Sequence, residues 1–444
     1  MLTRICVLFA VLAATPMWAQ VDSGANAGGG GADDAQMQTP PPVSSAAFLT
    51  AVGDELRADY LRLGVTTSMG YIDNLYAGES TGTLNETIYS ISPMISWDRR
   101  TERQDQTFSY APGFTLYQPS STLNETNQKA LGRYSLRLTP HSTIVASDAF
   151  LRTSTANGSA FAGVGGTVSG SLQSQAPGVV PPFAQLRSNM ANGEFTLQTS
   201  RMSMIGIAGM AATLDYPNSS EATGLADSGI RAGTAFYNRR VTESQYLGAT
   251  YQYSDFLTYP ENTTGETQTH SITAFYTFYP TEHLSLSITG GPQHYEISEM
   301  PFPSTNGWGP SVMASLGWQG ERTSFAANYS RQVTGGGGLL GAFDTSLAGA
   351  SARWQISRGW TIAATGSYDD FKTLGALVPA GEQGGRTLSG GAMLVHAIGQ
   401  RLRMTFDYEH VHEAYAGVVS IVSNPNSNQE TVSVTWQLSR PLGR

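Results

Sequence analysis

The chain has 444 residues, of which 13% are charged and 49 are glycine, and its formal net charge at pH 7 is -9. A soluble enzyme of this length usually carries about twice that share of charged residues, and an acidic chain with scattered cations has no surface suited to nucleic acid. The abundance of hydroxyl, aromatic and glycine residues instead favours long β-strands that contact both water and lipid.

The N-terminus has the pattern of a secretory signal peptide. Arg4 precedes an apolar run that ends at Ala14, and Ala19 stands directly before the expected cleavage site, although Met17 is larger than the residue usual at its position. The alternative is an N-terminal membrane anchor, but the apolar run is too short to span a bilayer as a helix. We therefore expect a signal peptide over residues 1–19.

Residues 20–59 are expected to form a disordered or weakly ordered periplasmic lead. They include the segments GANAGGGGADD and TPPPVSS, which offer too little apolar surface to order a chain. Cys6, the single cysteine, lies within the predicted signal peptide. The mature chain would therefore lack disulfides, thiolate nucleophiles and cysteine-based zinc sites, which is compatible with export.

An alternating pattern is clearest in the segment from Thr269 to Thr289, THSITAFYTFYPTEHLSLSIT. Apolar and hydroxyl residues alternate before Pro280, and the alternation restarts at Leu284, so each half places its apolar side chains on one face of a strand. The break between the halves is too short for anything but an antiparallel hairpin. The segment predicts a hairpin with one apolar face and one hydroxyl-rich face.

Short turns recur at intervals of about 40 residues, the range in which repeat architectures are found. Their expected positions are Arg99–Arg100, Pro140–His141, Ser200–Arg201, Arg239–Arg240, Pro280–Thr281, Gly320–Glu321, Arg358–Gly359 and Gln400–Arg401. These eight hairpins, with one strand before them at about 61–71 and one after them at about 431–439, give eighteen strands. An even count places both termini on the same side, where the first strand can pair with the last and remove the open edges.

The predicted fold class is all-β, a transmembrane antiparallel up-and-down β-barrel of about 18 strands over residues 60–440, followed by a tail at 441–444. Strands of about ten to thirteen residues match the length that a tilted strand needs to cross a bilayer. Apolar residues keep to one face, whereas charged residues keep to the other, as expected for a wet lumen. The alternative is a soluble eight-bladed propeller, but each blade would need four short strands.

Aromatic residues fall near the expected strand ends. Those close to the short turns are Trp97, Phe278, Tyr279, Trp318, Trp354, Trp360 and Trp436, and those close to the longer loops are Tyr117, Tyr216, Tyr259 and Tyr368. This arrangement predicts two interfacial girdles. The alternative interpretation is that aromatic residues are common in strands for intrinsic reasons.

The segment ISPMISWDRRTERQDQTFSYAPGFTLYQPSSTLNETNQKALGRYSLRLTPHSTI and the C-terminal TVSVTWQLSRPLGR resemble the β-barrel porins of bacterial outer membranes, including those found with exopolysaccharide secretion systems. The likeness consists of a Tyr-x-Pro-Gly-aromatic strand, an Asn-rich loop and a strand that ends at a Thr-Pro turn, and it covers about residues 60–444. The chain departs from many such barrels by continuing past Trp436 and Leu438 instead of ending on an aromatic residue.

The resemblance implies a protein of the Gram-negative cell outer membrane that acts as a channel for small hydrophilic solutes or for an exported polysaccharide. Its implied partners are these solutes, outer-membrane lipid and the barrel-assembly machinery. It implies no cofactor, no nucleic acid and no catalytic residue. Two other classes stay open, a structural or adhesive barrel with a blocked lumen and a barrel-borne hydrolase.

Catalytic and metal motifs are weak in this sequence. His410 and His412 share one face of a strand beside Glu409 and Glu413, but no third metal ligand stands at a suitable spacing, so two solvated rim histidines are the simpler interpretation. The glycine run from Gly335 to Gly338 lacks the Lys-Ser/Thr of a phosphate loop. No Gly-x-Ser-x-Gly elbow stands in a convincing setting, so we do not expect an enzyme.

The lumen is where we expect function. Lys129, Arg133 and Arg137 recur every four residues on one strand face and predict a basic ladder that favours anionic solutes. Arg403, Asp407 and Glu409 occupy the corresponding polar face of a later strand. Together these six residues are the predicted pore lining. The alternative for the ladder is a structural network in which its cations pair with Asp98 and Asp105 on neighbouring strands.

The loop over about residues 154–186 contains no charged residue and is rich in Gly and Ser. It is long enough to fold back into the lumen, and we expect it to narrow the pore, because long loops in compact proteins are usually functional or disordered. The alternative is that the loop is disordered. Neither the solute nor the oligomeric state follows from the sequence.

Overall fold

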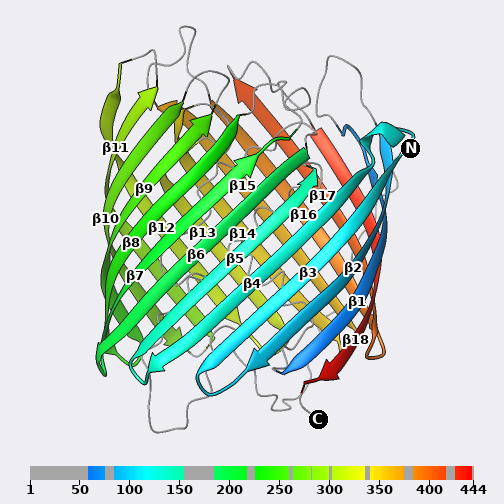
Figure 1. Cartoon of the computed structure of the whole chain (residues 1–444), viewed down its shortest axis with the longest axis horizontal. Helices are drawn as coiled ribbons and strands as arrows, with labels where there is room; N and C mark the ends of the chain where they lie inside the picture. Colours follow the sequence, from blue (N-terminus) through cyan, green and yellow to red (C-terminus); the bar gives the residue numbers. More distant parts are fainter. Residues whose placement is uncertain are drawn as a thin grey trace.

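The computed structural model is a barrel of eighteen antiparallel strands (Figure 1). It describes residues 59–75, 85–154, 185–217, 226–259, 264–281, 283–299, 303–335, 341–374, 384–416 and 426–442. The strands are β1 Tyr60–Ile72, β2 Glu86–Arg100, β3 Gln104–Gln118, β4 Glu125–Thr139, β5 Ser142–Ser154, β6 Gln185–Ser200, β7 Ser203–Asp215, β8 Asp227–Thr242, β9 Gln245–Tyr259, β10 Gly265–Thr281, β11 Leu284–Glu299, β12 Thr305–Gln319, β13 Thr323–Gly335, β14 Ala342–Ser357, β15 Trp360–Leu374, β16 Gly384–Ile398, β17 Leu402–Ala416 and β18 Asn426–Pro441. The predicted signal peptide and nearly all of the predicted lead lie outside the described residues.

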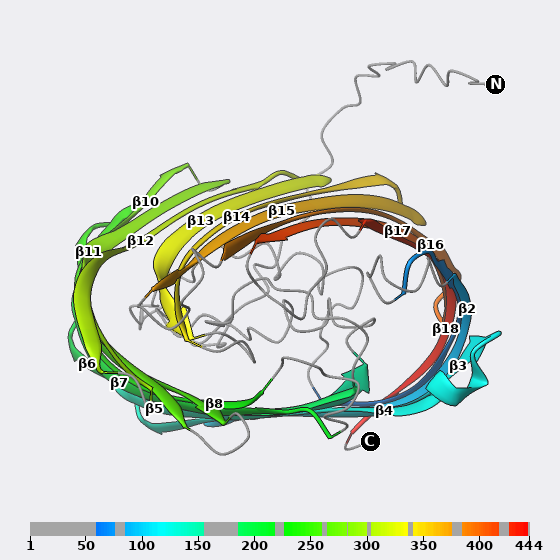
Figure 2. The same cartoon turned by 90° about the horizontal axis from the view of Figure 1, so that it is seen from above.

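Each strand pairs with its neighbours in the sequence, and the last strand pairs with the first. The ladder between β1 and β18 runs from Tyr60 opposite Pro441 to Ile72 opposite Gln429, so the sheet closes on itself. Seen from above, the strands form an oval ring (Figure 2). The predicted up-and-down barrel of eighteen strands is confirmed.

Short connections lie at the end of the barrel that carries both Tyr60 and Pro441. Most of the predicted turns match, but the connection between β8 and β9 follows Thr242, later than the predicted Arg239–Arg240. The two arginines continue the ladder because they pair with Leu247 and Tyr246. Strands of 13 to 17 residues are also longer than expected, since pairing continues beyond the apolar part of each strand.

Apolar side chains project from the outside of the barrel. Ile207, Ile272 and Ile288 are each at least 60% exposed, although a soluble fold would bury such residues. On β12, Trp318 and Trp308 are both exposed and lie ten residues apart, which on a strand tilted by about 45° corresponds to about 23 Å, close to the height of a membrane-spanning apolar band. The outer face is therefore the face that contacts lipid.

The aromatic residues divide between the two faces. Trp97, Trp318, Trp354 and Trp436 share the outward face with their apolar neighbours across the ladders. Three predicted girdle residues are wrong, and one of them, Tyr216, is only 7% exposed. Tyr117 is only 1% exposed and packs inside with Ile72 and Ile88, because it has the opposite parity to the outward Phe114 and Leu116 on β3. Tyr279 lies edge-on to Tyr246, which packs on a cluster of buried residues.

Only one short helix, η1 Ser121–Leu123, occurs among the described residues. Within the same residues no helix has the length and apolar character needed to span a bilayer.

Candidate functional site

The charged residues predicted to line the pore lie on β4 and β17. Arg133 pairs with Thr107 while its neighbour Gly132 pairs with the exposed Phe108, so Arg133 projects toward the lumen side. The same parity places Lys129 and Arg137 beside it. On β17, Leu402 and Phe406 share the outer face, which leaves three predicted residues on the lumen side: Arg403, Asp407 and Glu409. The strand register therefore brings all six predicted residues to one face of the wall.

Other strands present hydroxyl groups to the lumen instead of charges. The inner face of β10 carries Thr267, Thr269, Ser271, Thr273 and Thr277, together with Phe275, at the positions that alternate with outward Ile272 and Tyr276. The charged strands β17 and β4 lie on opposite long sides of the oval, near the same end (Figure 2). A solute at that end of the lumen thus has acidic groups on one side and basic groups on the other.

A recess of about 240 Å³ lies in the wall between these two charged strands. Its lining residues are Ser68, Gly70, Ile88, Ser90, Ile91, Ser92, Gly113, Thr115, Asn127, Gln429 and Thr431. Thr431 pairs directly with Asp407, and Gln429 pairs directly with Glu409. At the other side, Asn127 belongs to the same face of β4 as Lys129. The recess is therefore bordered by an acidic pair on one side and a cation on the other.

Hydrogen bonds fix the polar groups of the recess. The hydroxyls of Ser68 and Ser90 lie 2.6 Å apart, and the Asn127 Nδ2 donates to Thr115 Oγ1 at 2.7 Å. Asn127 Oδ1 is buried and has no partner among the described residues. This oxygen is an acceptor available to a solute that carries a hydroxyl or amine donor.

Two glycines keep the recess open. A Cβ added to Gly70 would lie 3.0 Å from Glu430 O and from Thr431 Oγ1, and a Cβ added to Gly113 would lie 3.4 Å from Ser92 Oγ. A larger side chain at either position would extend into the hollow that the serine and threonine hydroxyls surround. Glycine is needed here for space.

The alternative pairing of the ladder with neighbouring carboxylates is not formed. Asp105 pairs with Arg100 at 3.0 Å, and no ion pair within 4.0 Å joins Lys129, Arg133 or Arg137 to another described residue. The carboxylate that Arg133 influences electrostatically is Glu194 on β6. The basic ladder is therefore accessible to ions in the lumen.

The end of β13 near Gly335, at the top of the barrel in Figure 1, turns into the lumen. No sequence signal indicated this turn. Its ladder with β12 stops at Arg331 opposite Val312, and β13 then passes inside β11 and β12 (Figure 2). The Gln293 side chain of β11 holds it there, donating from Nε2 to Val333 O at 3.1 Å and accepting from Val333 N at 2.8 Å. A strand end thus narrows the lumen.

Apolar packing supports this inward strand end. Val333 packs with Ile297 and Ala342, and all three are nearly fully buried. Behind them, Phe343 and Phe371 meet edge to face at 5.6 Å. The predicted narrowing loop at 154–186 lies almost wholly outside the described residues, so its role stays a prediction.

The histidine pair on β17 belongs to the outer face. His410 Nδ1 lies 2.8 Å from Asn428 Oδ1, and His412 Nδ1 lies 2.6 Å from Asn426 Oδ1, so each ring bonds an amide on β18. Among the residues that the structure describes, no group of three or more His, Cys, Asp or Glu side chains is arranged to hold a metal ion. Gly335 ends β13, and the rest of the glycine run lies outside the described residues.

Closure, strand tilt and a lipid-facing apolar band define the class of protein, a transmembrane β-barrel of the Gram-negative outer-membrane type. No protein-family model matches the chain. No curated protein matches it either.

Solved structures similar to this chain include three outer-membrane-type barrels, each about 10% identical or less. Pseudomonas aeruginosa OpdQ is 10% identical, with 85% of this chain and 99% of that chain covered and a TM-score of 0.43. OpdK of the same organism, solved with vanillate, is 10% identical, with 86% of this chain and 99% of that chain covered and a TM-score of 0.44. Acinetobacter baumannii OccAB4 is 9% identical over 87% and 100%, with a TM-score of 0.43.

Proposed function

We propose that this barrel is a channel for small hydrophilic solutes. The observation that supports the proposal most directly is the recess beside the lumen, which combines hydroxyl groups, the free Asn127 Oδ1 and charges of both signs at its borders. A wall of this chemistry can exchange hydrogen bonds with a hydrated solute without holding it too tightly to leave.

The placement of charges defines which solutes are favoured. Lys129 and Arg133 attract an anionic group, while Asp407 and Glu409 on the opposite side attract a cationic or donor group. A small solute with both kinds of group, or with one acid group and several hydroxyls, would lie across the lumen in a preferred orientation. Solutes with a single positive charge would gain less, because the basic ladder repels them.

The inward end of β13 favours small solutes over an exported polysaccharide. A polymer that crosses the membrane needs a wide continuous passage, but Val333 and its neighbours occupy part of the lumen cross-section. A hydrolase has little support, since no histidine among the described residues is bonded to both a serine and a carboxylate. A structural barrel with a blocked lumen is the alternative that transport measurements address.

Swelling of proteoliposomes tests the proposal. Purified protein is reconstituted, and the vesicles are diluted into isotonic solutions of a neutral disaccharide, a monosaccharide, a sugar acid or a zwitterionic amino acid. We expect rapid swelling with the monosaccharide, the sugar acid and the amino acid, and slow swelling with the disaccharide. Vesicles that swell no faster than protein-free vesicles in every solute would contradict a channel.

A further inference from the structure

The wall of the barrel is interrupted between β12 and β13. On its β11 side, β12 pairs as far as Thr305, whereas on its β13 side pairing ends at Val312. The backbone from Thr305 to Ser311 therefore has no strand partner on that side among the described residues. All other neighbouring strands have ladders that continue well toward the upper end, so this seam is a local feature of the wall.

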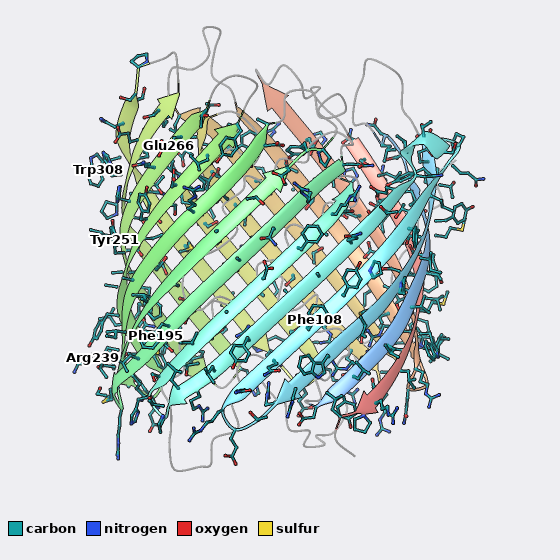
Figure 3. The ribbon with its side chains drawn as sticks, in the orientation of Figure 1. Phe108, Phe195, Arg239, Tyr251, Glu266 and Trp308 are labelled. Carbon is teal, nitrogen blue, oxygen red and sulfur yellow. The ribbon has the colours of Figure 1, made fainter. Side chains whose placement is uncertain are left out.

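The unpaired edge lies toward the end of the barrel that carries the long connections, which is the extracellular end in outer-membrane barrels, so it faces the outer leaflet. Trp308, in the middle of this edge, is 71% exposed and projects outward from the wall (Figure 3), and its ring lies 5.0 Å from that of His294. Unpaired backbone groups cost several kcal/mol each in lipid, so irregular backbone at this depth occurs where protein covers it or where it lines a cavity. Pro310 removes one donor from the edge, but the other amides remain.

The inner end of the seam is apolar, in contrast to the hydroxyl-lined lumen elsewhere. Ile297, Val333 and Ala342 form its core, with Tyr295 and Leu374 packed against them. A Cβ added to Gly309 of β12 would lie 3.4 Å from Val333 Cγ2, so the inward strand covers the unpaired edge from inside. Apolar groups thus continue from the lumen to the lipid-facing Trp308.

The end of β13 that covers the unpaired edge of β12 is held to the β12 side by fewer hydrogen bonds than a strand ladder provides. On the β12 side, the two hydrogen bonds between the Gln293 amide and the Val333 backbone fasten β13 to the wall in place of strand pairing. On its other side, β13 stays paired with β14 as far as Gly335 opposite Ala342. The end of β13 can therefore move away from β12 only together with the end of β14, and it does so against fewer hydrogen bonds than a continuous ladder would provide.

We propose that the seam between β12 and β13 is a lateral port through which amphipathic molecules with a single apolar chain pass between the lumen and the outer leaflet. The apolar chain replaces the contacts of Val333 with Ile297, and the polar head group stays on the lumen side. Hydrophilic solutes do not use this route, because burying their polar groups in the apolar cluster is unfavourable. The port is a function separate from the hydrophilic channel.

A disulfide across the seam tests the port. The double variant Gly309→Cys/Val333→Cys places two sulfurs at a site where a Cβ added to Gly309 lies 3.4 Å from Val333 Cγ2, so the two side chains are in contact and their sulfurs can reach each other. Cys6 is the only natural cysteine and lies in the predicted signal peptide, so no competing thiol is expected in the barrel. The matched control, Ser367→Cys/Ser389→Cys, links two residues that face each other across the β15–β16 ladder. Their hydroxyl oxygens lie 2.7 Å apart.

Uptake of radiolabelled dodecanoate is measured in cells that lack their own fatty-acid channel, with each variant oxidised and then reduced. We expect the oxidised seam variant to take up no more dodecanoate than cells without the protein, and reduction to restore uptake, whereas the control disulfide has no effect. Gln293→Ala is expected to raise uptake about tenfold, the change expected from loss of about 1.4 kcal/mol of closure. Equal uptake by the oxidised and reduced seam variant, or wild-type uptake no higher than background, would overturn the port.

Single-channel conductance of the same oxidised seam variant separates the two functions. A conducting channel with blocked dodecanoate uptake supports the port as well as the hydrophilic channel. Dodecanoate uptake that depends on the seam in a protein without ionic conductance would support the port and contradict the channel. Comparing each cysteine variant with itself under oxidation and reduction excludes misfolding as the cause, since both states come from the same folded protein.

Discussion

Gln293 on β11 binds the backbone of Val333 on β13 with both ends of its side-chain amide, at 3.1 Å and 2.8 Å. The two residues belong to strands that are not neighbours in the barrel, and their contact exists only because β13 passes inside β12. One side chain therefore fixes the position of the strand end that narrows the lumen.

Removing this side chain is expected to widen the pore. Gln293→Ala leaves the Val333 amide and carbonyl without their partner, so the strand end should leave its position more often and single-channel recordings should show a larger mean conductance with more current noise. Gln252→Ala is the matched control, because Gln252 also faces inward but its Nε2 donates to Ser254 Oγ on its own strand. Indistinguishable recordings from the Gln293 variant and the wild type would show that the strand end does not control the pore.

The basic ladder is expected to set ion selectivity. Arg133→Glu changes the lumen charge by two units, and at about 10 Å in water this alters the energy of a permeating ion by about 0.8 kcal/mol, or a factor of about four in the permeability of that ion. The reversal potential in a salt gradient should move toward cation selectivity. Arg152→Glu makes the same change of charge on the outer face of β5, opposite Gln128, and should leave the potential unchanged.

The acidic pair should act in the opposite direction. Asp407→Asn with Glu409→Gln removes two negative charges beside the recess, so anions should permeate more readily by a similar factor of about four. Glu430→Gln is the control, because Glu430 pairs with the exposed Tyr408 on the outer face. If both acidic variants behave like the wild type in reversal-potential measurements, the acidic side of the lumen has no role in selectivity.

Barrel closure should depend on Asp73, which follows β1. Its carboxylate accepts hydrogen bonds from the Asn428 backbone amide and from Asn428 Nδ2, the latter at 2.7 Å. Asp73→Ala should cost about 2 kcal/mol, because bonds to a charged acceptor are among the stronger ones. The folded band in cold detergent gels should then disappear at a lower urea concentration. Asn74→Gly removes one exposed bond to Asn426 O, at a residue whose φ of 56° glycine adopts without strain, and should change the midpoint less.

Strand alternation made most of the fold predictable from the sequence. The hairpin at 269–289 shows the reason, since the period of two survives in β10 and β11 wherever one face contacts lipid and the other contacts water. Equal spacing of the short turns then fixed the strand number. The turn after β8 lies later in the chain than predicted. Arg239 and Arg240 are typical of turns, but here they extend the ladder with β9.

The functional details were less predictable because they depend on contacts between distant segments. The recess combines residues of β18 with residues of β1 to β4, and only the closing ladder brings Thr431 near Ser68. The inward turn of β13 has no local signal, since Gln293 precedes Val333 by 40 residues and both lie in ordinary strand sequence. Tyr117 lies near a strand end as a girdle residue would, but its parity on β3 turns its side chain inward, where it is buried.

Single-channel recording in planar bilayers tests the central claim most directly, namely that this chain encloses a continuous water-filled lumen. Purified, detergent-folded protein should insert and produce stepwise increases in current that scale with salt concentration. Repeated insertion of folded barrels without any current step would contradict the channel and would favour a structural barrel with a blocked lumen.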